Sequence, residues 1–172
     1  ITRVQGVGSF VAAHKGSTAL LEVRNIADEI RERGHAHTSR MTLMQEEVAP
    51  SEIGYALGLV TGARVFHSIM VHSENGLPIQ IEDRFVNPSI CPKYMEQDFR
   101  DMTPNAYLTA VAPITRTEQI VEAVAPQLWE CKLLGIDRNE PCLMIRRRTW
   151  SDAGNVTTAR LLYPGTRYRL EG

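Results

Sequence analysis

The chain lacks the features that mark several classes of protein. Its 172 residues contain three cysteines, Cys91, Cys131 and Cys142, which are an odd number at spacings too wide for a disulfide framework or a zinc knuckle. No apolar run approaches the 18 residues of a membrane-spanning helix, and no signal peptide opens the chain. We therefore expect reduced thiols in a cytoplasmic protein that has no membrane partner.

The chain also lacks an excess of charge of either sign. Its net charge is −1 and its pI is near 6.6, so it has no global attraction to nucleic acid or anionic lipid. A hydrophobic fraction of 43% and a charged fraction of 23% are typical of a globular domain. We expect one domain of ordinary size, or one domain plus a fragment of another, in a chain that does not itself bind DNA.

Catalytic signatures are missing as well. The sequence contains no GxSxG, HExxH or GxxxxGK[ST] motif, and each of these motifs serves a specific chemistry. His35 and His37 in "GHAHT" are possible metal ligands, but two histidines one residue apart after a helix more often lie in a solvated loop. The sequence thus predicts no enzyme, no cofactor and no metal site.

Turn and cap signals divide the chain into short helices and long strands. The segments "ARVFHSIMVH", "SENGLP" and "IQIEDRFV" predict an antiparallel hairpin over 63–88. The segments "PCLMIRRRTW", "SDAGN" and "VTTARLLY" predict a second hairpin over 141–163. The other predicted elements are helices at 25–33, 51–57, 103–112 and 127–134, and strands at 36–48 and 167–170.

The two halves of the chain resemble each other. "EEVAPSEIGYALGL" at 46–59 aligns with "EAVAPQLWECKLLGI" at 122–136, and a long hairpin follows each segment. The order of elements is then β-α-β-β twice, which predicts one antiparallel sheet with flanking helices. The predicted fold class is therefore α+β with an internal pseudo-repeat.

The first hairpin carries the most suggestive polar side chains. Alternation along its strands places three side chains of each strand on one face, namely Ser68, Met70 and His72 on one strand and Gln80, Glu82 and Arg84 on the other. A His72–Glu82 pair with Arg84 nearby would suit a small polar ligand. The alternative is a set of cross-strand salt bridges on a solvated face. By the same alternation, residues 146–148 cannot form one basic patch.

The start of the chain resembles a known DNA-binding element. "VQGVGSFVA" is similar to the end of the wing in winged helix-turn-helix regulators of the GntR superfamily. This resemblance implies that residues 1–12 end a wing whose first strand and DNA-reading head lie outside the chain. Residues 13–20 are then a linker, and residues 21–172 form a separate ligand-binding domain.

The rest of the chain resembles the UTRA effector-binding domain of the HutC subfamily. The resembling segments are "NIADEIRERGH", "VFHSIMVHSENGLPIQIEDRFVNP", "TPNAYLTAVAP", "EPCLMIRRRTW" and "ARLLYPGTRYRLEG". The family has a chorismate-lyase-like fold and binds a small acidic metabolite. The resemblance places effector-binding positions at Arg24, Asn25, Met70, His72, Glu82, Arg84, Tyr107 and Tyr163, with the anionic group of the ligand at the helix start near 24–27.

The resemblance also implies a function and partners. It indicates the effector-sensing domain of a bacterial repressor of histidine-utilisation genes, which binds urocanate and releases operator DNA held by the missing head. Two-fold operators call for a C2 homodimer. Relatives that bind sugar phosphates carry arginines where this chain has Met70 and His72, which favours a lighter anion with an aromatic ring. The alternatives are a sensor for another small acid or sugar phosphate, and a chorismate-lyase-like enzyme.

Overall fold

The computed structural model of the protein describes residues 2–3, 9–10, 16–19 and 23–171, with side chains from residue 23 onward. A six-stranded antiparallel sheet with strand order β4-β5-β6-β9-β8-β7 forms its centre. These strands are β4 (His37–Val48), β5 (Arg64–Glu74), β6 (Leu77–Val86), β7 (Arg116–Val124), β8 (Cys142–Ser151) and β9 (Gly154–Pro164). The predicted α+β class with an antiparallel sheet is confirmed.

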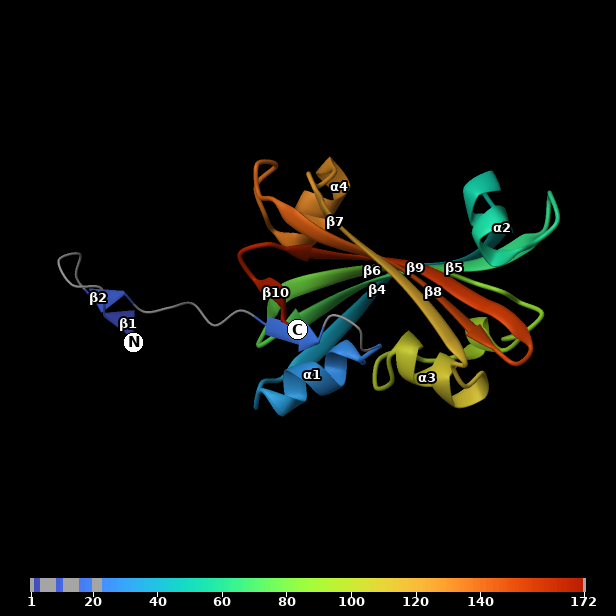
Figure 1. Cartoon of the computed structure of the whole chain (residues 1–172), viewed down its shortest axis with the longest axis horizontal. Coiled ribbons are helices and arrows are strands. Elements are labelled where there is room, and N and C mark those ends of the chain that lie inside the picture. The colour runs from blue at the N-terminus through green and yellow to red at the C-terminus, as the bar shows by residue number, and fades with distance from the viewer. Residues whose placement is uncertain (1, 4–8, 11–15, 20–22, 172) are drawn as a thin grey trace.

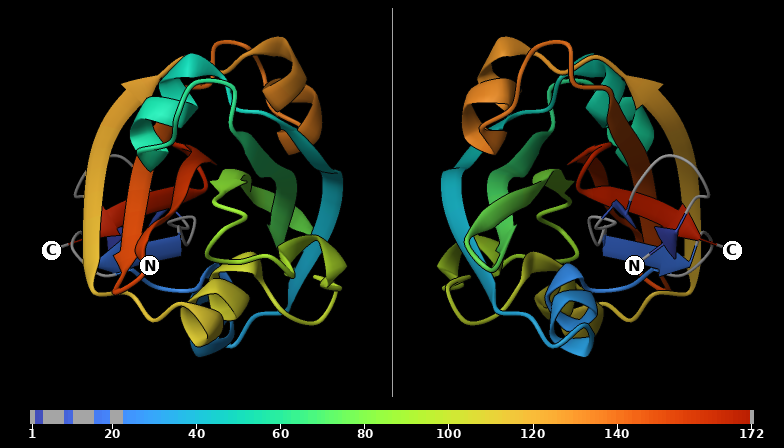
Figure 2. Two further views of the ribbon diagram at one scale, coloured as in Figure 1. Left: turned by 90° about the vertical axis from the view of Figure 1, so that its right-hand side faces the viewer. Right: turned by 90° about the vertical axis from the view of Figure 1, so that its left-hand side faces the viewer.

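Helices cover both faces of the sheet. Two of them, α1 and α3, lie on one side, and α2 and α4 lie on the other (Figure 1), and the end-on views show the twisted sheet between the two layers (Figure 2). Their bounds are α1 (Ile26–Glu32), α2 (Ser51–Leu57), α3 (Pro104–Val111) and α4 (Leu128–Leu134), with a short 3-10 helix at Tyr94–Glu96 that the sequence analysis missed. None of the helices in the described part of the chain is long and apolar enough to cross a membrane.

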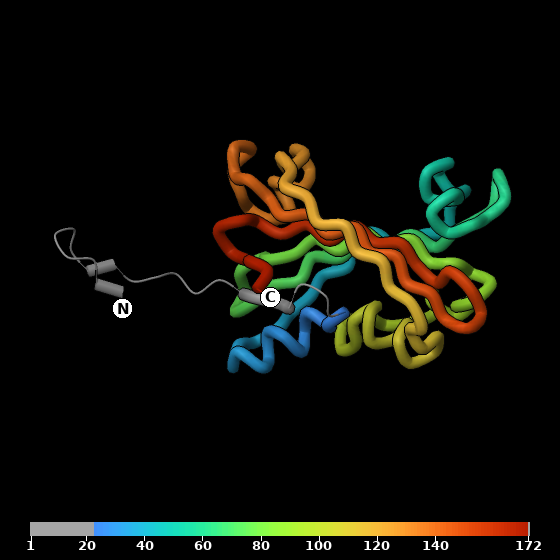
Figure 3. Tube along the Cα trace, in the orientation of Figure 1, coloured from blue at the N-terminus to red at the C-terminus, as the bar shows by residue number. Residues whose placement is uncertain are grey.

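The pseudo-repeat is present in the structure. The units β4-α2-β5-β6 and β7-α4-β8-β9 have the same order of elements, and their hairpins lie side by side at the centre of the sheet (Figure 3). The glycines that end α2 and α4, Gly58 and Gly135, both adopt a left-handed backbone conformation with φ of 66° and 62°. Glycine is the residue that reaches this conformation without a steric penalty, so the matched glycines mark the end of each repeat helix.

The strands alternate between the two helical layers. The even-numbered side chains of β5, such as Phe66 and Met70, pack with Tyr94 and Tyr107 on the side of α1 and α3. Val71 packs with Leu134 of α4 and other apolar residues on the opposite side. Successive side chains of a strand point to opposite faces, which also separates Arg147, buried at 5% exposure, from the exposed Arg146. The prediction that residues 146–148 form no single patch is confirmed.

Two strand pairings involve the segments before residue 23. Within residues 1–12, β1 (Thr2–Arg3) pairs antiparallel with β2 (Ser9–Phe10). Within the predicted linker, β3 (Gly16–Ala19) pairs in parallel with β10 (Tyr168–Glu171). Residues 16–19 are therefore hydrogen-bonded to the end of the domain. Residues 4–8, 11–15 and 20–22 lie outside the described residues, and the assignment of a wing stays a prediction.

Candidate functional site

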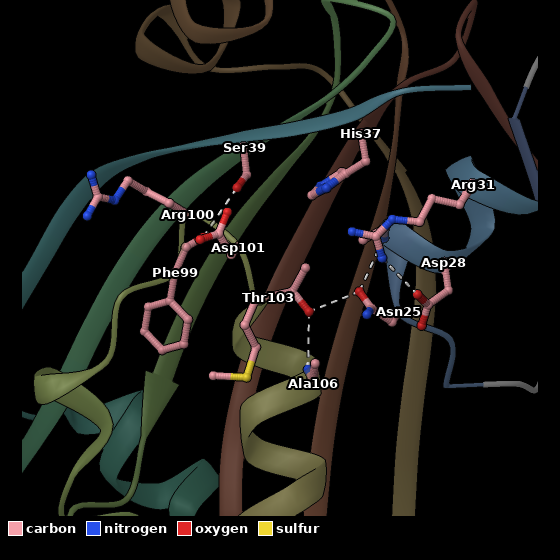
Figure 4. Close-up of a pocket in the computed structure, with 12 residues that line it drawn as sticks. Asn25, Asp28, Arg31, His37, Ser39, Phe99, Arg100, Asp101, Thr103 and Ala106 are labelled. Carbon is pink, nitrogen blue, oxygen red and sulfur yellow. Dashed lines mark hydrogen bonds and ion pairs between the residues drawn. The ribbon is translucent and has the colours of Figure 1, made fainter. Parts of the chain in front are cut away.

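A cavity of about 350 Å³ opens beside the start of β4, between α1 and the loop that leads into α3 (Figure 4). Polar and charged side chains make up most of its lining. The lining residues are Asn25, Ala27, Asp28, Arg31, His37, Ser39, Phe99, Arg100, Asp101, Met102, Thr103 and Ala106. Both signs of charge are present, so the cavity can contact an anionic group and a hydrogen-bond donor in the same small molecule.

Two helix starts form one wall of this cavity. Asn25 precedes α1 and its Oδ1 accepts a hydrogen bond from the Ala27 amide at 3.2 Å, as Asn does at many helix starts. Thr103 precedes α3 and its Oγ1 accepts from the Ala106 amide at 3.1 Å. The Thr103 hydroxyl in turn donates to Asn25 Oδ1 at 2.9 Å (Figure 4). This bond fixes the two helix starts relative to each other.

A buried polar row crosses the sheet behind the cavity. His72 has no exposed surface, and Glu82 and Arg84 are 3% and 2% exposed. Arg84 Nε donates to Glu82 Oε1 at 2.7 Å, and His72 Nε2 lies 3.5 Å from Glu82 Oε2. The interpretation of these residues as salt bridges on a solvated face is wrong, because all three side chains are buried between the sheet and the α1–α3 layer.

His37 connects this row to the cavity. Its Nε2 lies 3.0 Å from Nδ1 of His72, and the two rings stack with centroids 5.3 Å apart. The expected solvated loop fits His35, which lies between α1 and β4 with its side chain 38% exposed and binds Glu74 at 2.5 Å. The same expectation is wrong for His37, which is the first residue of β4. The two histidines therefore make different contacts. Among the residues that the structure describes, no group of three or more His, Cys, Asp or Glu side chains could hold a metal ion.

Burial and close neighbours determine the protonation of Glu82 and His37. Burial alone would raise the pKa of Glu82, but Arg84 and His72 outweigh it and hold this pKa below its usual range. Burial, together with the neighbouring His72 and Arg31, lowers the pKa of His37 to about 4. At neutral pH, Glu82 is therefore an anion paired with Arg84, and His37 is a neutral ring at the cavity wall.

Of the eight residues predicted to contact the effector, Asn25 lines the cavity. Arg24 lies at an adjoining shallow pocket and forms an ion pair with Glu32. His72, Glu82 and Arg84 are not among the residues that line the cavity, and His72 contacts the lining residue His37. In this structure they support a lining residue instead of lining the cavity themselves.

The other three predicted residues lie deeper in the core. Met70 is 1% exposed and lines a second pocket on the other side of Phe99. Tyr107 belongs to an aromatic cluster with Phe99, 6.1 Å away between ring centroids. Tyr163 is buried, stacks on Tyr168 and accepts a hydrogen bond from Gln80. Tyr163 therefore shapes the core near α1 and does not close a side of the cavity.

Several lining residues were not predicted from the sequence as effector contacts, most notably His37, Arg31 and Phe99. Two signals in the sequence point to some of them. Arg31 follows Asp28 by three residues, which places both on one face of α1. His37 and Ser39 share one face of β4 by alternation. Phe99 lies in an irregular loop that carries no periodic signal.

Comparison with known proteins decides the family. A UTRA domain model matches residues 32–169. The chain belongs to the UTRA-domain family. The histidine utilization repressor of Pseudomonas putida is 57% identical over 172 residues, which are 100% of this chain and 69% of that protein. The crystal structure of the C-terminal domain of the histidine utilization repressor from Pseudomonas syringae pv. tomato is 55% identical with a TM-score of 0.77, covering 80% of this chain and 97% of that one.

Solved structures of lower sequence identity share the fold. The structure of PhnF from Mycobacterium smegmatis has a TM-score of 0.86 at 20% identity and covers 94% of this chain and 72% of that one. The relatives with high identity are named as transcriptional repressors and not as enzymes. The UTRA domain described here is accordingly the small-molecule sensor domain of a transcriptional repressor, and its cavity is the candidate effector site.

Proposed function

We propose that this UTRA domain senses urocanate and controls a repressor of histidine-utilisation genes. The observation that carries the proposal is the small cavity in which Arg31, Asn25 and His37 meet, in a chain 57% identical to a histidine utilization repressor. Urocanate has a carboxylate at one end and an imidazole ring at the other. The cavity offers a cation for the first group and a buried histidine relay for the second.

The position of the ligand carboxylate follows from the contacts in the cavity. Three amides at the start of α1 are already engaged, because the Ala27 amide donates to the Asn25 side chain and those of Asp28 and Glu29 donate to the Asn25 carbonyl. Arg31 instead extends its guanidinium toward the cavity, where it pairs with Asp28 at 3.1 Å (Figure 4). We place the carboxylate against Arg31, since a guanidinium binds a carboxylate with two parallel hydrogen bonds.

The route from the cavity to the start of the chain is short. Asn25 follows β3 by a few residues, α1 contacts β3, and β3 is paired with β10. A ligand that bridges α1 and the loop before α3 changes the stability of this arrangement. The coupling free energy between an effector site and an operator site is typically about 1–3 kcal/mol. A ligand supplies this coupling when its binding free energy differs by that amount between two arrangements of the heads.

Calorimetry with urocanate, histidine and glucosamine 6-phosphate tests the proposal. We expect urocanate to bind most tightly, and Arg31→Gln to weaken its binding by about ten- to a hundredfold, because a charge-assisted hydrogen bond contributes about 1.5–3 kcal/mol. The matched control is Arg146→Gln, since Arg146 is exposed and pairs with Glu122 away from the cavity. Tighter binding of the sugar phosphate would instead assign the domain to the alternative class of sensors, and turnover of any ligand would indicate an enzyme.

A further inference from the structure

Arg147 of β8 is a buried cation with a single hydrogen-bond partner among the residues that the structure describes. Its residue surface is 5% exposed, and its Nε donates to Oε1 of Gln119 at 3.0 Å. Within the same described residues, its two terminal nitrogens have no hydrogen-bond partner and no carboxylate forms an ion pair with it. A guanidinium carries N–H donors on all three of its nitrogens. Most of the donors of this buried group are therefore unused.

The second buried arginine of this face, Arg84, shows what Arg147 lacks. Arg84 is paired with Glu82 at 2.7 Å, and this carboxylate outweighs burial and raises the pKa of Arg84. Burial lowers the pKa of Arg147, because the attraction of the more remote Glu82 is opposed by the repulsion of Arg84. Glu82 and Arg84 neutralise each other, so the pair supplies no counter-charge to Arg147.

The remaining neighbours of Arg147 supply no counter-charge either. Tyr163 and Tyr168 face it with phenol groups, and burial raises the pKa of Tyr163 well above 10. Glu29 of α1 is a buried acid that acts on Tyr163, and in the described part of the chain it forms no ion pair with Arg147. One positive charge thus stands between the sheet and the α1–α3 layer without a paired anion among the described residues.

The strand register places a small side chain beside this charge. Arg84, Ala159 and Arg147 lie directly opposite one another on β6, β9 and β8, so their side chains share one face of the sheet. Ala159 contributes a methyl group, and no bulky side chain of β9 separates the two arginines. Thr149, two residues after Arg147, brings a buried hydroxyl to the same face. This part of the face offers positive charge and hydrogen-bond donors to an acceptor.

Arg147 also lies close to the edge of the sheet. β7 is the edge strand, and its residue Gln119 pairs with Arg147 of β8. Gln119 is half-buried, so its side chain stands between solvent and the guanidinium. A small anion that displaces the Gln119 side chain reaches Arg147 without separating any strands.

We propose that Arg147 binds a small oxyanion, a carboxylate or a phosphate, between the sheet and the α1–α3 layer. Such an anion accepts two parallel hydrogen bonds from a guanidinium and supplies its counter-charge. A buried charge that lacks both lowers the stability of the fold, so Arg147 contributes to binding at the expense of the stability of the ligand-free protein. The inference goes beyond the proposed function, because it does not depend on which effector the cavity binds.

The first test measures the stability of the ligand-free protein in a Tris chloride buffer that contains no oxyanion. Arg147→Met keeps most of the side-chain volume and removes the charge, and we expect its urea midpoint to equal or exceed that of the unmutated protein. Arg84→Met should lower the midpoint, because it leaves Glu82 buried without its counter-charge. A lower midpoint for Arg147→Met would show that Arg147 stabilises the free fold, and would overturn the inference.

The second test measures anion binding by thermal unfolding. Sodium phosphate and urocanate are titrated separately, with sodium chloride of equal ionic strength as the reference. We expect at least one of the two anions to raise the unfolding temperature of the unmutated protein, and Arg147→Met to weaken its apparent affinity by about tenfold or more, as for lost charge-assisted hydrogen bonds. Arg146→Met is the matched control, because the adjacent Arg146 is exposed and pairs with Glu122.

The outcomes identify the anion and separate the two proposals. A phosphate effect that requires Arg147 indicates a separate inorganic anion, whereas a urocanate effect that requires Arg147 indicates the carboxylate of the effector. If neither anion stabilises the unmutated protein, or if Arg147→Met and Arg146→Met respond equally, the role of Arg147 is refuted. If urocanate binds to no variant, the proposed function fails, while the phosphate titration still decides the role of Arg147.

Discussion

At the scale of single residues, the central feature is a charge pair that has no access to water. Glu82 and Arg84 are both buried and joined by a 2.7 Å hydrogen bond, in contrast to the exposed pair of Glu46 and Arg64. Removing one partner of a buried pair leaves the other charge unsolvated, whereas an exposed charge is solvated by water. Glu82 therefore contributes to the stability of the fold.

We expect Glu82→Gln to lower the free energy of unfolding by about 3–5 kcal/mol, because Arg84 remains buried without its counter-charge. The exposed control, Glu46→Gln, should change the free energy of unfolding by less than about 1 kcal/mol. Urea unfolding followed by circular dichroism measures both. Equal stability of the two variants would show that Arg84 finds another partner or reaches water, and would contradict the assignment of a buried pair.

At the scale of elements, one histidine joins three neighbouring strands. His67 of β5 lies 2.8 Å from Asp83 of β6 and 3.3 Å from Glu47 of β4, and it stacks on Phe85. Burial alone would lower the pKa of His67, but the two carboxylates outweigh this effect and raise it above 6.5. The protonated ring thus holds the β4-β5-β6 half of the sheet together.

The raised pKa gives His67 a pH-dependent contribution to stability. The protonated form binds its partners in the folded state, so this contribution is complete below about pH 6.5, the unfolded value, and is lost as the pH rises through the higher folded-state pKa. We expect His67→Gln to destabilise the protein more at pH 6 than at pH 9, as measured by urea unfolding at the two pH values. His35→Gln serves as a comparison, and a difference for His67→Gln that does not change with pH would contradict the prediction.

An irregularity in the strand pairing decides which side chains share a face. At the end of the first hairpin Glu74 pairs with Leu77 and Ser73 pairs with Pro78, but His72 pairs with Gln80 after a bulge. Without this bulge, His72 would lie opposite Ile79, and Glu82 would point to the other face of the sheet. The predicted sharing of a face by His72 and Glu82 is confirmed, and the bulge is its structural cause.

At the scale of the whole molecule, the pseudo-two-fold order of the sheet leaves edge strands β4 and β7 at opposite ends. Several large apolar side chains are exposed outside the cavity, including Tyr55 at 85%, Val60 at 79% and Leu128 at 57%. Exposed apolar groups of this kind are common where a second chain packs. They support the proposal of a homodimer, which the symmetry of a two-fold operator requires.

Light scattering at micromolar concentration tests this proposal. We expect a particle of twice the mass of the 19.3 kDa chain, because a two-fold operator is bound by two copies related by the same symmetry. Tyr55→Glu should shift the particle toward the monomer mass if the α2 surface forms the contact, and Glu52→Gln on the same helix is the matched control. A monomer at all concentrations would contradict the proposal.

The sequence by itself determined the local features of the protein. The helix at Ser51–Leu57, the two hairpins and the repeated order of elements follow from cap residues, turn residues and alternation, which act over a few neighbouring residues. The absence of catalytic motifs and the segments shared with UTRA domains indicated a sensor. These conclusions needed no knowledge of which distant residues meet.

The tertiary structure alone decided which residues form the candidate cavity. His37 and His72 are 35 positions apart, and Asn25 and Thr103 are 78 positions apart. Their contacts depend on strand register and bulges, on the docking of α1 beside β4, and on the path of the loop before α3, none of which leaves a periodic pattern in the chain. The burial of a side chain also depends on the whole fold. For that reason Glu82 and His72 are buried in the core, whereas His37, which contacts His72, lines the cavity.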